Sequence, residues 1–378
     1  MSLYNNNFNN DMADDMTNAQ RFTPVTRLSF LSMITASFLI SGLIYAATEK
    51  SKGAIYQAPR NSQGQPDLQG IWDFRTLTPL ERPVEAGDNA VFSAEDAEKF
   101  RQQKVAGHDV DKQRDIPASF DVEAAYNTFW WDFGTEMNED RRTSLIVDPA
   151  NGRLPALTPK AREDMKRNLL HTPPVRVFGS IGEVTFRPKG PEALGLSERC
   201  LVGFNAGPPL IPSAYNNNIR IVQAPGYVVL FTEMIHDARI IAMDDSPHLP
   251  NDFKKWSGGS RGHWEKDTLV IETRNFTDKT PVYQLPINLK DPAMNGVVGR
   301  GKDFKLTERL TRTSDSRLLY EYTIDEPNTF TKPFTVAIPM KASEEQLFEY
   351  ACHEGNHSMA GMLGGARTLE KEEAAARN

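Results

Sequence analysis

The second half of the chain carries a series of short β-branched and aromatic segments, and this series constrains the fold more than any other feature. Each segment has the length and composition of a β-strand and ends at turn-forming residues. Tight turns at 224–226, 265–267 and 314–316 predict hairpins between consecutive strands. The sequence therefore predicts an antiparallel meander that forms a barrel or a sandwich. The expected strands are 220–223, 227–243, 262–265, 268–273, 304–313, 318–325, 334–340 and 347–352.

The region 67–217 is expected to add one strand, helices and long loops that pack on this meander. Its first segment, 67–74, contains a Gly-x-Trp sequence that resembles the start of lipocalin-like (calycin) barrels, where the tryptophan closes one end. Capping residues predict helices over 93–105, beginning at Ser93, and over 158–170. The predicted fold class is thus mainly β, with a few short helices in the N-terminal half.

An apolar, uncharged run over 28–47 determines the cellular location that we expect for the rest of the chain. Two arginines precede this run and two alanines end it, as in a secretory signal peptide. The run is also long enough to cross a bilayer as a helix, so an uncleaved membrane anchor is the alternative. We therefore expect a periplasmic or secreted protein, which touches a membrane only through 28–47 if that segment is retained.

The remaining boundaries follow from composition. Residues 1–47 are expected to be the signal peptide or anchor and 48–66 a polar linker, and the meander domain covers 218–367. A solvated tail is expected over 368–378. The net charge of −7 argues against a general nucleic-acid-binding role. The oligomeric state stays open.

Two cysteines, Cys200 and Cys352, follow the export signal. In an oxidising compartment they could pair and close a long loop between the middle and the end of the chain. Two buried free thiols are the alternative, because the sequence gives no distance between them.

The residues HEGNH at 353–357 match the HExxH motif of zinc peptidases letter for letter. In those enzymes the motif lies inside a helix, so that both imidazoles face one metal ion. Here the preceding segment is predicted to be a strand, and Gly355 would interrupt a helix. We therefore expect no metal site, but we keep His353 and Glu354 as candidate catalytic residues.

The segment 233–240 is the stronger catalytic candidate. Strand alternation would place His236 on one face among apolar neighbours, with Asp237 and Arg239 on the other face. A histidine in an apolar cavity could act as a general acid or base, because its surroundings would shift its pKa. The alternatives are a structural histidine in the core and a simple ion pair between Asp237 and Arg239.

Three further clusters could bind a ligand. His263 and Glu265 would share one strand face and orient each other, and the aromatic stretch around Trp130 could stack on an apolar or sugar ligand. Adjacent amides precede the first strand of the meander and suit a polar ligand or a turn. These amides are Asn216, Asn217 and Asn218.

Taken together, several motifs resemble a family of exported bacterial proteins from acidobacterial and proteobacterial genomes, for which we carry over no activity. They are PDLQGIWDF, SLIVDPANGRLPALTP, ERC, YNNN, EMIHDARII, RGHWEKDTLVIETRNFTDKT and EYACHEGN, and they cover roughly 60–367. The resemblance implies secretion and a shared β-rich domain. The last motif usually reads CHEGNY in that family, so His357 departs from it.

No phosphate-binding glycine loop, nucleophile elbow or dinucleotide fingerprint is present in the sequence, so we expect no organic cofactor. The leading hypothesis is an exported protein that binds or acts on a small molecule, as a cofactor-free hydrolase or lyase with His236 as acid or base. A non-catalytic ligand-binding protein and an envelope scaffold are the alternatives. The catalytic hypothesis expects His236, His263, His353 and Glu354 to gather at one pocket.

Overall fold

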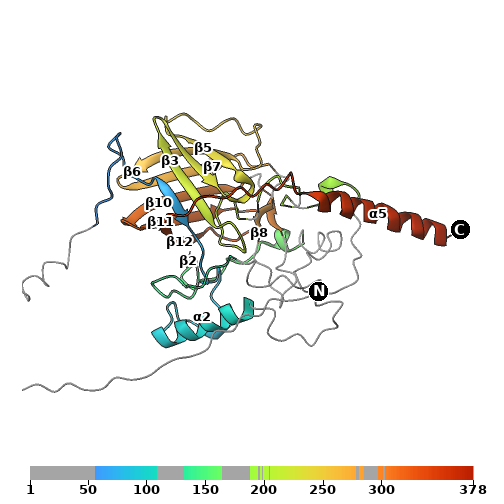
Figure 1. Cartoon of the computed structure of the whole chain (residues 1–378), viewed down its shortest axis with the longest axis horizontal. Coiled ribbons are helices and arrows are strands. Elements are labelled where there is room, and N and C mark those ends of the chain that lie inside the picture. The colour runs from blue at the N-terminus through green and yellow to red at the C-terminus, as the bar shows by residue number, and fades with distance from the viewer. Residues whose placement is uncertain are drawn as a thin grey trace, which may run out of the picture. The chain divides into compact units, whose positions relative to one another are not determined.

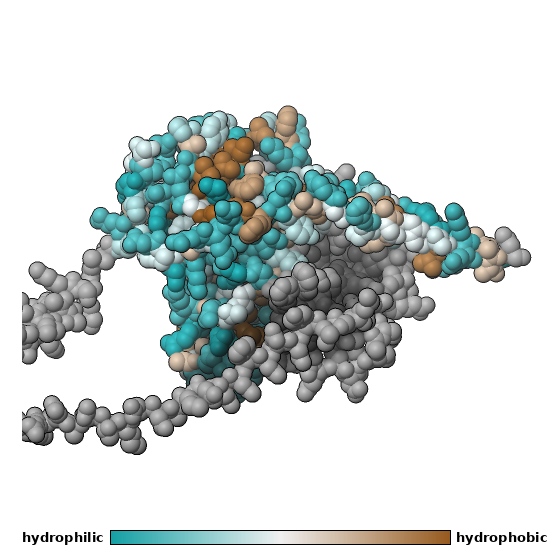
Figure 2. Space-filling view, viewed as in Figure 1, coloured by the Kyte–Doolittle hydropathy of each residue, from teal (hydrophilic) through white to brown (hydrophobic). Residues whose placement is uncertain are grey.

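The computed structural model describes residues 56–108, 132–163, 188–277, 281–284, 297–300 and 303–377, apart from the single residues 195, 198 and 204. They form a mainly β structure whose fully described α-helices are α2 (Ala94–His108) and α5 (His357–Ala376) (Figure 1). The face of the described residues that Figure 2 shows is mostly hydrophilic. The strands are β1 (Gly70–Asp73), β2 (Ile146–Asp148), β3 (Asn218–Ala224), β4 (Tyr227–Thr232), β5 (Ala238–Ala242), β6 (Gly259–Glu265), β7 (Thr268–Arg274), β8 (Pro281–Gln284), β9 (Val297–Arg300), β10 (Lys305–Ser314), β11 (Arg317–Asp325) and β12 (Phe334–Ser343).

Nine of these strands close into a barrel. The main sheet has the order β1-β3-β4-β5-β6-β7-β10-β11-β12-β2, and β1 also pairs with β12, which completes the ring. Strand β2 lies outside the ring and pairs with β12. Strands β8 and β9 form a separate two-stranded sheet. The predicted barrel is therefore confirmed.

The predicted antiparallel meander needs two corrections. Strands β5 and β6 run parallel and share only the pair Ala242↔Arg261, because a long connection replaces the hairpin that would make them antiparallel. Strand β1 comes from the region before residue 218 and closes the ring between β3 and β12. Residues 67–217 therefore build part of the barrel wall, besides packing on it.

Large side chains fill the interior of the barrel. On β11 the buried residues alternate with partly exposed ones, so that Leu318, Tyr320, Tyr322 and Ile324 all point inward. The rings of Tyr320 and Tyr322 lie 5.7 Å apart between their centroids. Burial of these residues removes a large apolar area from water, which is the main favourable term in folding.

Trp72 of the Gly-x-Trp sequence is part of this core. Its indole Nε1 donates a 2.9 Å hydrogen bond to the carbonyl of Leu68, and the guanidinium carbon of Arg312 lies 5.7 Å from the ring centroid. The side chain is almost completely buried. Trp72 therefore packs in the core on β1, and its closing of one end of the barrel stays a prediction.

The first predicted helix is confirmed as α2, whose start is capped by Ser93. The Ser93 hydroxyl accepts a 3.0 Å hydrogen bond from the Asp96 amide and donates one to the Asp96 carboxylate. Of the second predicted helix, residues 159–163 are helical and the rest lies outside the described residues. The described residues of the tail predicted over 368–378 are nearly all exposed, and they are helical, because α5 continues to Ala376 through residues with high helix propensity.

Residues 344–356 connect β12 to α5, and we call this segment the strap. The strand predicted over 347–352 is wrong, because this part of the strap does not pair with a neighbouring strand. Side-chain contacts position it instead. A disulfide joins Cys352 of the strap to Cys200, with 5.7 Å between their Cα atoms. The carboxylate of Glu233 accepts a 2.9 Å hydrogen bond from the Phe348 amide. The pairing of the two cysteines is therefore confirmed.

Within the described residues, none of the helices combines the length and the apolar character that a membrane span requires. The predicted signal peptide or anchor over 28–47 lies outside these residues.

Candidate functional site

The turn between β4 and β5 replaces part of the strand that the sequence predicts over 233–240. The Thr232 amide donates a 2.9 Å hydrogen bond to the Asp237 carbonyl, so the intervening residues bulge out as a single 3₁₀ turn, η3 (Met234–His236). Ile235 and His236 both have left-handed φ angles, 49° and 43°. Such angles are strained for a β-branched residue and are typical of functional sites.

His236 therefore does not point into an apolar cavity, and the alternation predicted for it is wrong. Its side chain is 43% exposed and its Nδ1 lies 3.6 Å from the Glu349 carboxylate of the strap. The turn removes it from the strand ladder, which begins again only at Ala238. Any chemical role of His236 would therefore depend on its exposed position in the turn between β4 and β5.

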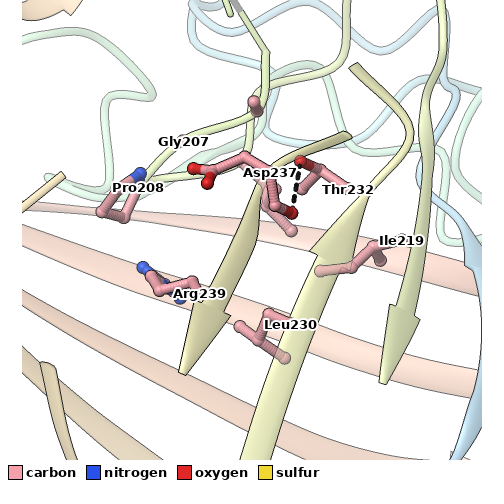
Figure 3. A pocket seen from close by; sticks show the side chains of 9 residues that line it. Gly207, Pro208, Ile219, Leu230, Thr232, Asp237 and Arg239 are labelled. Atoms are coloured by element: carbon pink, nitrogen blue, oxygen red, sulfur yellow. Dashed lines mark hydrogen bonds between the residues drawn. The ribbon is translucent and has the colours of Figure 1, made fainter. Parts of the chain in front are cut away.

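A pocket opens beside this turn, at one end of β4 and β5 (Figure 3). Its volume is about 260 Å³ including the part open to solvent, and it has room for about one water molecule at its base. The lining combines apolar residues with three polar ones. The lining residues are Ala206, Gly207, Pro208, Leu210, Ile219, Leu230, Thr232, Asp237 and Arg239.

Asp237 and Arg239 both line this pocket, because residues two apart in an extended segment point to the same side. Figure 3 shows the Asp237 carboxylate turned toward Pro208. It makes no hydrogen bond or ion pair with any residue in the described part of the chain, since Arg239 pairs elsewhere. The ion pair considered for Asp237 and Arg239 is therefore absent from the described contacts.

The partner of Arg239 is Glu308, which projects from β10 into the barrel. The contacts from Nη2 to Oε1 and from Nη1 to Oε2 are both 2.8 Å, and the Glu308 side chain is completely buried. The Tyr320 hydroxyl donates a 2.7 Å hydrogen bond to Glu308 Oε1 and accepts one of 3.1 Å from the Leu210 amide. This Arg239–Glu308–Tyr320 network thus ties the pocket loop to the core.

The network fixes the charge of its members. Burial alone would lower the pKa of Arg239, but the adjacent Glu308 carboxylate raises it above its usual value. Burial, reinforced by the same carboxylate, raises the pKa of Tyr320 well above its usual value. Arg239 therefore stays charged and Tyr320 stays neutral.

The three asparagines proposed as ligands hold loops together. The Asn217 side chain is fully buried; its Nδ2 donates to the carbonyls of Asp132 and Ser213, each at 2.8 Å. Asn218 Nδ2 donates a 3.1 Å bond to the Glu233 carboxylate. Asn216 has a left-handed φ of 50° in the same turn. The turn alternative accounts for their contacts.

His263 and Glu265 lie on the exposed outer face of β6 and contact each other, as predicted. Their Nε2 and Oε1 atoms are 3.4 Å apart, and Arg309 forms a 2.8 Å ion pair with Glu265. Neither residue lines the pocket. Trp130 lies outside the described residues.

His353 and Glu354 form part of the strap just before α5, and neither lines the pocket. The HExxH match therefore does not lie inside a helix, since α5 begins only at His357. Among the residues that the structure describes, no three His, Cys, Asp or Glu side chains are grouped to hold a metal ion. The pocket brings together Asp237 and Arg239 from the predicted set. The four residues that the catalytic hypothesis expects at one pocket do not line it, namely His236, His263, His353 and Glu354.

Sequence reasoning missed Glu308, Tyr320 and the 206–210 loop. Glu308 has a detectable signal, because it occupies the inward-facing position of β10 between Leu306 and Leu310. A charged residue at such a position needs a buried partner of opposite charge. No comparable signal marks the loop, whose position depends on tertiary contacts.

Comparison of the chain with protein-family models, curated proteins and solved structures gives no match. The family resemblance of its motifs therefore stays a prediction, and the site is interpreted from its own geometry.

Proposed function

We propose that this protein binds a small molecule at the mouth of its barrel, in the pocket between β4, β5 and the 206–210 loop. The observation that supports this is the Asp237 carboxylate, which lines the pocket and has no partner among the described residues. The Asp237 residue is partly exposed, so water can solvate its carboxylate when the pocket is empty. A carboxylate left facing a pocket is therefore available to a ligand.

The pocket also has the composition of a binding site. Pro208, Leu210, Ile219 and Leu230 give it apolar walls, and a few polar groups stand among them. This combination is common in small-molecule sites, where polar groups orient a ligand held by apolar contact. Because large side chains fill the ring, the geometry favours a ligand at the mouth over one enclosed within the barrel.

The proposal places this protein in the periplasm or at the cell envelope. Two features support the location, namely the apolar run over 28–47 and the Cys200–Cys352 disulfide. Disulfides form and persist mainly in oxidising compartments.

A second candidate function is cofactor-free hydrolysis or elimination at the same pocket. It is favoured by the room for about one water molecule beside Asp237 and by His236 on the adjoining strained turn. A carboxylate within reach of a water can act as its general base, and an imidazole nearby can supply a proton. In this case the bound molecule is a substrate.

Ligand-observed NMR with a library of small polar compounds of mixed charge tests both candidates on the full-length protein. We expect at least one compound to bind, with an affinity at least ten-fold weaker for Asp237→Asn, because a charge-assisted hydrogen bond is lost. The matched control Asp252→Asn changes an exposed loop residue and should leave the affinity unchanged.

The same spectra report catalysis. Product signals that disappear with His236→Ala, while binding persists, would support the hydrolytic candidate. Absence of binding by every compound, or equal binding by wild type and Asp237→Asn, would overturn the proposed site and leave the scaffold alternative.

A further inference from the structure

The pocket carries one carboxylate, Asp237, whose oxygens make no hydrogen bond or ion pair with the described residues. Arg239 is the positive residue in the lining, but both of its terminal nitrogens are 2.8 Å from the Glu308 carboxylate. A guanidinium and a carboxylate in bidentate contact cancel each other at short range. Asp237 is therefore left as the net charge of the pocket.

Tyr320 does not alter this balance. Its hydroxyl proton is engaged with Glu308 Oε1 at 2.7 Å, and burial raises its pKa well above the usual value. It stays neutral and does not reach the pocket as a free donor, since it is completely buried behind Leu210. Within the network, Arg239 Nη2 and the Tyr320 hydroxyl both donate to Glu308 Oε1, while Arg239 Nη1 makes an ion-pair contact with Glu308 Oε2 without a hydrogen bond.

The other two polar side chains in the lining, Asp237 and Thr232, offer acceptors. The Asp237 carboxylate accepts only. The Thr232 hydroxyl already donates to the carbonyls of Met234 and Asp237, each at 3.3 Å, so its oxygen is left to accept (Figure 3). A ligand group suited to this pocket must therefore donate hydrogen bonds.

The size of the pocket narrows the group further. It has room for about one water molecule between apolar walls, and a primary ammonium group is of similar size. An ammonium carries a compact positive charge and three donors. A carboxylate or phosphate would instead be repelled by Asp237, and the positive charge of Arg239 is already matched by Glu308.

We propose that the pocket binds the primary ammonium group of a small ligand, with the Asp237 carboxylate as its counter-ion and Thr232 as a further acceptor. This inference rests on the proposed function, because it names the ligand class of the same pocket. The hydrocarbon part of the ligand then lies against Pro208 and Leu210.

The test uses three probes with one carbon skeleton and different head groups, butylammonium, butanol and butyrate. Each is titrated to high millimolar concentration into isotope-labelled full-length protein, and the amide NMR signals of Thr232 and Asp237 are followed. We expect butylammonium to shift these signals in a saturable way, and the other two probes to do so at least ten-fold more weakly or not at all.

Variants locate the interaction. Asp237→Asn should weaken butylammonium binding about ten- to a hundred-fold, because it removes a charge-assisted hydrogen bond. The control Asp252→Asn should leave the binding unchanged. Should Asp237→Asn fail to fold, the comparison of the three probes on the wild-type protein still decides the question.

Equal or stronger binding of butanol or butyrate would overturn the ammonium preference and leave the pocket as a ligand site. Failure of butylammonium to bind would also overturn the ammonium preference. If a library compound still bound in an Asp237-dependent manner, the pocket would remain a ligand site. If neither the probes nor the library bind, the ammonium inference and the proposed function both fail.

Discussion

Burial of Glu308 is tolerated because Arg239 and Tyr320 both engage its carboxylate. An uncompensated buried carboxylate costs several kcal/mol, and a charged partner offsets much of this cost. Glu308 Oε1 accepts two hydrogen bonds, while Oε2 makes only the ion-pair contact with Arg239 Nη1. Each partner is therefore as much a part of the barrel wall as the apolar residues around it. Tyr320 has the further task of holding the Leu210 amide at the pocket.

Substitution Tyr320→Phe tests this role through its pH dependence. At pH 7 we expect the free energy of unfolding to fall by about 1–2 kcal/mol, because a buried hydrogen bond to a carboxylate is lost. Unfolding returns the tyrosine pKa from its raised folded value to about 10. Wild-type stability from this group is therefore present below pH 10 and is lost as the pH rises beyond it. Urea unfolding between neutral and alkaline pH measures the difference.

The difference in free energy of unfolding between wild type and Tyr320→Phe should consequently become smaller at alkaline pH. The control Tyr227→Phe changes an exposed tyrosine, so its effect on the free energy of unfolding should be small. A gap for Tyr320→Phe that does not change with pH would show that the folded state places no special constraint on this hydroxyl.

At the scale of elements, the strap depends on the disulfide for its position. It has no strand partner, and its described contacts with the β4–β5 turn pass through Glu233 and His236. The disulfide joins residues 152 apart in sequence, so it restricts the unfolded chain strongly.

The double variant Cys200→Ser/Cys352→Ser should therefore lower the free energy of unfolding by about 2–5 kcal/mol, measured by urea denaturation. Reduction of the wild-type protein should produce a similar loss. Two thiols that react freely in the native, non-reduced protein would contradict the pairing.

The elements also show what sequence patterns can and cannot predict. Strands such as β10 and β11 follow from their alternation, because each buries one face against a single core. The segments 233–240 and 347–352 have strand-like composition, but the Glu233 carboxylate and the Cys352 bond override it locally. The site could be predicted only in part, because Asp237 and Arg239 are adjacent in sequence while Glu308 is not.

For the molecule as a whole, the apolar run over 28–47 predicts export. Cell fractionation followed by intact mass measurement checks this prediction. We expect the protein in the periplasmic or secreted fraction, with a mass reduced by the loss of residues up to 46 or 47. A full-length mass in the membrane fraction would indicate the uncleaved anchor, and a full-length mass in the cytoplasm would contradict export.

The ring of the barrel has one weak link. Every other junction in it joins at least three residue pairs, whereas β5 and β6 share the single pair Ala242↔Arg261. Local opening of a sheet is easiest where the fewest backbone hydrogen bonds must break. We therefore expect local opening of the barrel to occur mainly between β5 and β6. Arg239 lies on β5 and Asp237 directly precedes it, so opening of this junction would loosen the strand that positions the polar residues of the pocket.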